Sequence, residues 1–291
     1  MSGIGRASVL IGAGTIVSRV TGLLRSVVLV AAIGSVSRAG DAFAVANQLP
    51  NNIYAIISTG LLTAVVVPQI VKAAAHADGG RAFISKLFTL GTVVLLAAAV
   101  VATAAAPLLV GLYASGFTED QLALATAFAY WCLPQIFFYG LYALLGEILN
   151  ARRVFGPYTW APIVNNIVSI AGFGAFIVLF GGPLQDVDLW SPTTIAVLAG
   201  TATFGIVVQT IVLVFFWRRA GLALRPDFRW RGVGLRHIGR LAGWTFLMVV
   251  AGQVAGIVQS NVLSAASGGN PANLASQNAW LLFMLPYSII V

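Results

Sequence analysis

The stretch Ser18-Arg19-Val20-Thr21-Gly22-Leu23-Leu24-Arg25 places two arginines inside an apolar run that extends from about residue 7 to residue 34. That run exceeds the ~20 residues that a helix needs to cross the hydrocarbon core of a bilayer. At 1.5 Å per residue, Arg19 would lie ~17 Å from one end of the run and Arg25 ~14 Å from the other. A lipid-facing guanidinium at that depth costs at least ~2.5–3.5 kcal/mol. We therefore expect both arginines to face water or an anionic partner inside a cavity, as in a transporter of something negatively charged.

The composition is that of a membrane protein. Hydrophobic residues make up 59% of the chain and charged residues only 8%, and the mean hydropathy is +0.94. The apolar segments are too long for barrel strands and lack strict alternation, so the sequence predicts an all-α polytopic fold. About eight transmembrane helices are expected, at residues 7–34, 41–74, 83–115, 120–151, 157–181, 192–217, 239–266 and 275–291.

The charged residues predict the orientation. With the N-terminus in the cytoplasm, the arginines and lysines of the loops lie on the cytoplasmic side except Arg38, whereas the outer loops hold Glu119, Asp120, Asp186 and Asp188. This asymmetry follows the positive-inside rule and predicts an N-in protein. It also explains the pI of about 10.3 without a nucleic-acid partner, for which the sequence offers no basic reading face.

The sequence gives no support for an enzyme, a metal site or a cofactor. Cys132 is a lone cysteine in an apolar run, which favours a small buried side chain, and His76 and His237 fall in loops away from carboxylates. There is no glycine-rich phosphate loop, nucleophile elbow or HExxH motif. Glycines such as Gly111 and Gly140 are better explained as positions of close helix packing.

The second apolar segment is irregular. As one straight helix it would be ~50 Å long, well beyond the ~30 Å hydrocarbon. Pro50 lies within it, flanked by Asn47, Gln48, Asn51 and Asn52. Proline removes a backbone donor and frees a carbonyl, so the pattern predicts an interruption with a kink. The amides either line a water-filled cavity or hold neighbouring helices together, and the sequence leaves both interpretations open.

One carboxylate stands near a basic loop. Glu147 lies close in sequence to Arg152 and Arg153, at the cytoplasmic end of the fourth segment. It either snorkels to the interface and pairs with that loop, or serves in coupling or gating.

The order of the segments predicts three parts. Residues 1–219 form a six-helix lobe, residues 220–240 a basic, amphipathic cytoplasmic linker, and residues 241–291 the first two helices of a second lobe. The motif Asn47-Gln48-Leu49-Pro50 has a weak counterpart, Phe283-Met284-Leu285-Pro286, six helices later. This agrees with tandem repeats in transporters, so we expect the chain to be a truncated or partial one.

Several motifs together carry a family resemblance. They are residues 18–25, Asp41-Ala42-Phe43, Gln48-Leu49-Pro50-Asn51, Gly146-Glu147-Ile148-Leu149-Asn150, Phe155-Gly156-Pro157, Ala161-Pro162 and Asn166. In identity and spacing they resemble the MurJ/MviN family, the bacterial lipid II flippases of the multidrug/oligosaccharidyl-lipid/polysaccharide exporter superfamily. The resemblance covers essentially the whole chain.

The resemblance implies a flippase that moves lipid II from the inner to the outer leaflet of the bacterial plasma membrane. Lipid II is an undecaprenyl diphosphate that carries a disaccharide-pentapeptide. The family fold has fourteen helices, with two six-helix lobes around a cationic cavity that opens to either side in turn. Arg19 and Arg25 match the first-helix arginines of the family and would bind the diphosphate. Asp41 matches its acidic residue at the start of the second helix and would pair with an arginine in the empty state.

Two positions depart from the family pattern. Tyr54 and Leu281 stand where the resemblance leads us to expect further cavity arginines. Three explanations are open. The anion could be bound by fewer charges, the missing charges could come from helices not present here, or the substrate could have been lost or changed. Arg19 and Arg25 are ~9 Å apart along the helix and ~120° apart around it, so their long side chains can still reach one cavity and donate forked hydrogen bonds to a diphosphate.

The sequence leaves three functions open. The first is the lipid II flippase, and the second is an exporter of another polyprenyl-linked glycan or an ion-coupled antiporter. An antiporter of cationic drugs would need carboxylates inside the membrane. The central charges here are basic, which disfavours that function. The third is a non-transporting membrane scaffold that recruits cell-wall synthesis enzymes. The expected partners are lipid II or a related polyprenyl-diphosphate lipid, together with membrane lipids. The scaffold function would add cell-wall synthesis enzymes.

Overall fold

The computed structural model describes residues 3–58, 81–151, 154, 156–219, 226–229, 235–266 and 272–290. Within these ranges the regular structure is entirely helical, which confirms the predicted fold class. A helix forms the hydrogen bonds of its backbone N–H and C=O groups within one segment. The interior of a bilayer requires this because it holds no water to bond them. Six helical stretches of the described part are long and apolar enough to cross a membrane.

Each of the eight predicted segments contains helix. Those of the first lobe form α1 (Gly3–Ile33), α2 (Arg38–Ser58), α4 (Arg81–Ala104) with α5 (Ala106–Tyr113), α6 (Glu119–Cys132) with α7 (Gln135–Ala151), α8 (Gly156–Phe180) and α9 (Pro192–Arg219). The short 3-10 helix η2 (Val187–Leu189) precedes α9. The last two segments form α10 (Leu235–Ala266) and α11 (Asn273–Ile290).

Two of the predicted segments are divided where a proline follows. The third breaks between α4 and α5, and Pro107 lies in the first turn of α5. The fourth breaks between α6 and α7, at Leu133 and Pro134. At this second break the Trp131 carbonyl accepts a hydrogen bond of 2.7 Å from the Thr203 hydroxyl of α9, so a neighbouring helix satisfies the backbone at the break.

The predicted interruption at Pro50 is not a break in the helix, and the kink stays a prediction. The helix α2 continues through Pro50, which is buried next to the fully buried Leu49. A proline removes one backbone hydrogen bond, and tight packing around it keeps the helix continuous. The remainder of the predicted segment, residues 59–74, lies outside the described residues.

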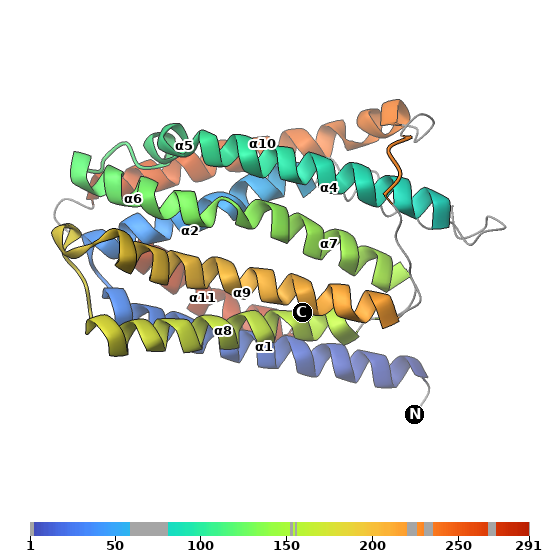
Figure 1. Ribbon diagram of the computed structural model, residues 1–291, viewed down its shortest axis with the longest axis horizontal. Helices are drawn as coiled ribbons and strands as arrows, with labels where there is room; N and C mark the ends of the chain where they lie inside the picture. Colours follow the sequence, from blue (N-terminus) through green and yellow to red (C-terminus); the bar gives the residue numbers. More distant parts are fainter. Residues whose placement is uncertain are drawn as a thin grey trace.

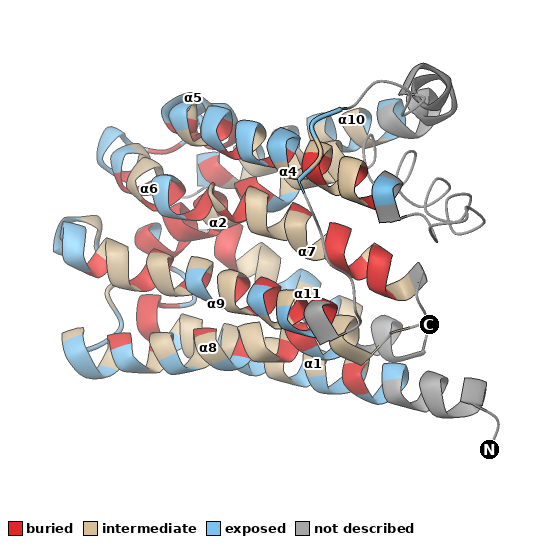
Figure 2. Cartoon of the chain, turned by 45° about the vertical axis from the view of Figure 1, so that its right-hand side comes forward, coloured by how far each residue is buried: buried red, intermediate tan, exposed pale blue. Residues whose placement is uncertain are grey.

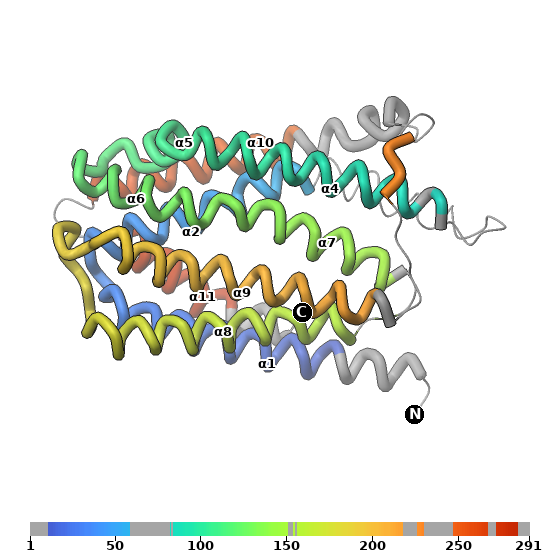
Figure 3. The backbone as a smooth tube through the Cα atoms, viewed as in Figure 1, coloured from blue at the N-terminus to red at the C-terminus, as the bar shows by residue number. Residues whose placement is uncertain are grey.

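The helices form one bundle. In it α8 packs against α1 and α9, and α2 packs against α6 and α7. Figure 1 shows α1 and α8 along one side and α4, α5 and α10 along the other, with α2 between them. The continuous tube of Figure 3 shows that the ends of α1, α2, α5 and α6 meet at one end of the bundle.

Aromatic rings fill the interior near that end. Phe128 contacts Phe43 and Trp190 with ring centroids 5.4 and 5.0 Å apart, and Phe176 stacks on Trp190 at 5.7 Å. Cys132 is fully buried beside them, as predicted. Figure 2 shows buried residues concentrated on the inward sides of the helices.

The outer surface carries large apolar side chains. Val20, Leu24 and Val27 form an exposed stripe on α1, and Val101 and Val178 are 67% and 84% exposed on α4 and α8. A soluble protein rarely exposes so continuous an apolar surface. The stripe gives α1 an apolar face suited to contact with lipid.

The prediction that glycines mark close helix packing is confirmed at Gly140 and wrong at Gly111. A Cβ on Gly140 would lie 2.1 Å from Leu95 Cδ2, so α7 approaches α4 closely there. A Cβ on Gly111 would meet no described atom of another segment within 4 Å.

The predicted linker, residues 220–240, overlaps α10, which begins at Leu235. In its described part, the Asp227 backbone N–H donates to the Thr89 hydroxyl of α4 at 3.0 Å. Arg229 pairs with Asp227 at 3.1 Å, and its hydrogen bonds hold the pKa of that half-buried carboxyl below the usual range. This part of the linker therefore lies against α4.

Candidate functional site

The first part of the candidate site consists of the two arginines of α1, Arg19 and Arg25. The Arg19 side chain is exposed and that of Arg25 is half-buried beside Tyr139 of α7. Within the described part of the chain, neither guanidinium forms a hydrogen bond or an ion pair. At ~100° per residue, both point away from the apolar stripe of α1. Two cations without a protein counter-charge are suited to receive an anion.

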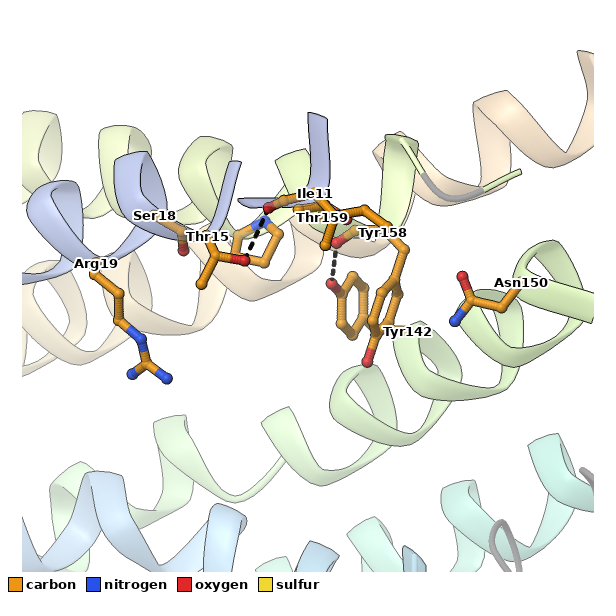
Figure 4. A pocket seen from close by; sticks show the side chains of 9 residues that line it. Ile11, Thr15, Ser18, Arg19, Tyr142, Asn150, Tyr158 and Thr159 are labelled. Carbon is orange, nitrogen blue, oxygen red and sulfur yellow. Dashed lines mark hydrogen bonds between the residues drawn. The ribbon is translucent and has the colours of Figure 1, made fainter. Parts of the chain in front are cut away.

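A cavity of about 500 Å³ adjoins Arg19 and lies between α1, α7 and α8. Figure 4 shows Arg19 at one end of it, Asn150 at the other, and two tyrosine rings between them. We call this space the α1–α7–α8 pocket; it is lined by Ile11, Thr15, Ser18, Arg19, Tyr142, Asn150, Tyr158, Thr159 and Pro162.

The centre of the pocket is a pair of stacked tyrosines. The rings of Tyr142 and Tyr158 have centroids 4.9 Å apart and an interplanar angle of 16°. The Tyr142 hydroxyl donates a hydrogen bond of 2.6 Å to the Tyr158 carbonyl. That carbonyl lies four residues before Pro162, which has no N–H to bind it. A Cβ on Gly146 would lie 2.3 Å from the Tyr158 ring, so the ring packs directly on α7.

Sequence reasoning missed both tyrosines. They lie on different helices and resemble ordinary interfacial aromatics when read along the chain. The one available signal is Pro162, because a proline within a helix leaves the carbonyl four residues earlier in need of a donor.

Asp41 joins α2 to α11. Its buried carboxylate accepts hydrogen bonds from the backbone N–H groups of Ala272 and Leu274, at 2.9 and 2.8 Å. These groups lie in the first turn of α11, where the helix dipole also favours a negative charge. Its predicted role as the charge partner of an arginine stays a prediction.

The amides near Pro50 lie between helices. Asn47 Oδ1 accepts a hydrogen bond of 3.4 Å from Gln135 of α7, and Gln48 Oε1 accepts one of 2.6 Å from Gln277 of α11. Both contacts support the interpretation that the amides hold helices together. Asn51 is exposed, and Asn52 lies beside Tyr113 of α5.

Of the remaining predicted residues, Glu147 and Tyr54 lie near tyrosines of the bundle. Glu147 is half-buried and lies within electrostatic range of Tyr54 and Tyr158. Its predicted partners, Arg152 and Arg153, lie outside the described residues. Tyr54 packs against Tyr139 with ring centroids 5.9 Å apart. Leu281 is half-buried on α11.

A second set of contacts joins α10 to the loop after α5. Asn261 Oδ1 accepts hydrogen bonds from the backbone N–H and the hydroxyl of Ser115, at 2.8 and 2.7 Å. Asn261 Nδ2 donates to the Leu112 carbonyl at 2.8 Å, and Ser264 Oγ accepts from the Gly116 N–H at 3.1 Å. Together with the bonds of Asp41 to α11, these join helices of the two predicted lobes, and we call them the lobe contact.

The fold and these sites define a multi-pass membrane protein with an arginine at a cavity inside a helical bundle. Its fold is similar to that of the solved structure "Lipid II flippase MurJ, inward closed conformation", with a TM-score of 0.71, 21% identity and coverage of 96% of this chain and 55% of that one. It is also similar to a crystal structure of MATE in complex with MaD3S, with a TM-score of 0.66, 16% identity and coverage of 99% and 62%.

The sequence model of the family "Lipid II flippase MurJ" matches residues 29–291, and the chain belongs to this family. Relatives include lipid II flippase MurJ of Burkholderia cenocepacia, 28% identical over 91% of this chain and 50% of the relative. The probable lipid II flippases of Haemophilus influenzae and Rhizobium tropici are each 28% identical, over 78% and 96% of this chain and 44% and 51% of their own length. The chain thus spans about half the length of these relatives.

Proposed function

We propose that this protein moves lipid II from the inner to the outer leaflet of the bacterial plasma membrane by alternating access, with its N-terminus in the cytoplasm. The observation that carries the proposal is the pair Arg19 and Arg25, which no described group neutralises. Membership of the flippase family and the names of the relatives support the same substrate.

The chemistry of the pair suits a diphosphate. A guanidinium presents a fixed fork of N–H donors that matches phosphate oxygens, and charge attraction is stronger inside a protein cavity than in water. Arg25 and its neighbour Tyr139 lie deeper in the bundle than Arg19. The diphosphate would be held between the two cations while the prenyl tail stays in the bilayer.

The positions of the α1–α7–α8 pocket and of the lobe contact fit transport from the inner to the outer leaflet. With the N-terminus inside, the α1–α7–α8 pocket lies in the cytoplasmic half of the bundle and the lobe contact lies at the outer end. A carrier whose outer end is closed can load a lipid from the inner leaflet. Opening of the lobe contact would then release it outside.

The first experiment substitutes the arginines. We expect Arg25→Ala to lower lipid II translocation in spheroplasts at least tenfold, because one of two charge-assisted contacts is lost, while protein abundance stays unchanged. Arg229→Ala, at an exposed linker position, is the matched control. Normal translocation by Arg25→Ala would overturn the proposal. Rescue of a strain depleted of its own flippase distinguishes this function from export of another glycan and from a scaffold.

The orientation has its own test. Val36 is 53% exposed in the loop between α1 and α2, and the native Cys132 is buried. A Val36→Cys variant should react with a membrane-impermeant thiol reagent in intact spheroplasts. Labelling only after the membrane is permeabilised would show the opposite orientation.

A further inference from the structure

We propose that the α1–α7–α8 pocket is the subsite for the sugar attached to the lipid's diphosphate, with Tyr142, Tyr158 and Asn150 as its recognition elements. This inference rests on the proposed function, because it assigns part of the same substrate. It goes beyond the arginines by naming where the uncharged portion of the head group binds.

The lining has the chemistry of a carbohydrate site. A sugar offers hydroxyl and amide groups around a ring with apolar C–H faces, so it needs polar partners beside an aromatic surface. The pocket supplies the amide of Asn150, the hydroxyls of Thr15 and Thr159, and the stacked rings of Tyr142 and Tyr158. Ile11 and Pro162 add apolar contact surface.

The charge distribution favours a neutral ligand next to an anion. Among the described lining residues, Arg19 is the one cation and none is a carboxylate. Arg19 lies at one end of the pocket (Figure 4). The lining of α1 extends from Arg19 back to Ile11, a length of ~12 Å along the helix. A sugar joined to a diphosphate at Arg19 would therefore extend past the tyrosine rings toward Asn150.

The recognition groups are held ready for a ligand. The hydrogen bond of Tyr142 to the Tyr158 carbonyl and the packing of Tyr158 on Gly146 fix the rings. Within the described part of the chain, the Asn150 amide makes no hydrogen bond, although it lines the pocket (Figure 4). Fixed rings reduce the entropy lost on binding, and an available amide can bond a sugar directly.

The test compares two lipids that differ only in the glycan. The whole protein, purified in lipid nanodiscs, is titrated with undecaprenyl diphosphate and with lipid II. We expect Asn150→Ala and Tyr142→Ala to raise the Kd for lipid II five- to tenfold, the effect of one or two lost hydrogen bonds or ring contacts. The Kd for undecaprenyl diphosphate should stay within twofold.

Controls separate recognition from folding. Tyr130→Ala removes a tyrosine that is 47% exposed on α6 and does not line the pocket, so it should bind both lipids normally. Asn150→Ala removes no described intramolecular bond, and its Tm should equal that of the native protein.

Each other outcome overturns the inference. Equal losses for both lipids would show a general structural role of the pocket, and unchanged affinity would place the sugar elsewhere. If the native protein binds undecaprenyl diphosphate as tightly as lipid II, the sugar subsite fails while the anion site stands. If the native protein binds neither lipid, both the sugar subsite and the proposed function fail.

Discussion

Asp41 shows how a single buried charge can join two helices that are far apart in the sequence. Its carboxylate caps α11, more than two hundred residues away along the chain. In Asp41→Asn one oxygen becomes an N–H₂ donor that faces a backbone N–H, so we expect a loss of about 1–3 kcal/mol at this contact. Hydrogen exchange of the Ala272 and Leu274 amides should become faster. Asp188→Asn, in an exposed loop, should leave them protected, and unchanged protection in Asp41→Asn would contradict the capping role.

At the residue scale, the sequence could indicate which charges matter but not what they contact. Arg19 and Arg25 are conspicuous because of their energetic cost in an apolar segment, and the structure leaves both without a described counter-charge. The partners of Asp41 are backbone groups of a distant helix, which no local pattern encodes. Tyr142 and Tyr158 meet only through the packing of α7 on α8.

At the element scale, proline positions did not predict where helices break. α2 and α8 continue through Pro50 and Pro162, whereas α6 ends before Pro134. At a continuous helix and at a break alike, a hydroxyl from another helix satisfies the freed carbonyl. The Tyr142 hydroxyl bonds the Tyr158 carbonyl before Pro162, and the Thr203 hydroxyl bonds the Trp131 carbonyl at the break. Such donors come from other helices, so hydrophobic periodicity found the segments but not their divisions.

The contact between α10 and the loop after α5 depends on a glycine. A Cβ on Gly116 would lie 2.4 Å from the Ala265 backbone nitrogen and 2.5 Å from its Cα. Because backbone cannot rotate away as a side chain can, we expect Gly116→Ala to push α10 from this loop and break the Ser264 bond. Spin labels on the two segments should show a longer separation. Gly111→Ala, which meets nothing within 4 Å, is the matched control; an unchanged distance in Gly116→Ala would show that the contact adapts.

At the scale of the whole molecule, the proposed transport requires the lobe contact to open and close, because a lipid head group cannot pass a closed outer end. Ser115 and Asn261 meet there, with 2.7 Å between Oγ and Oδ1. We expect a Ser115→Cys/Asn261→Cys variant to form a disulfide that lowers lipid II translocation at least tenfold, and a reductant to restore it. Each single-cysteine variant is a control, since the native Cys132 is buried. Oxidised protein that transports at the normal rate would show that this contact stays closed throughout the cycle, and that the head group leaves by another route.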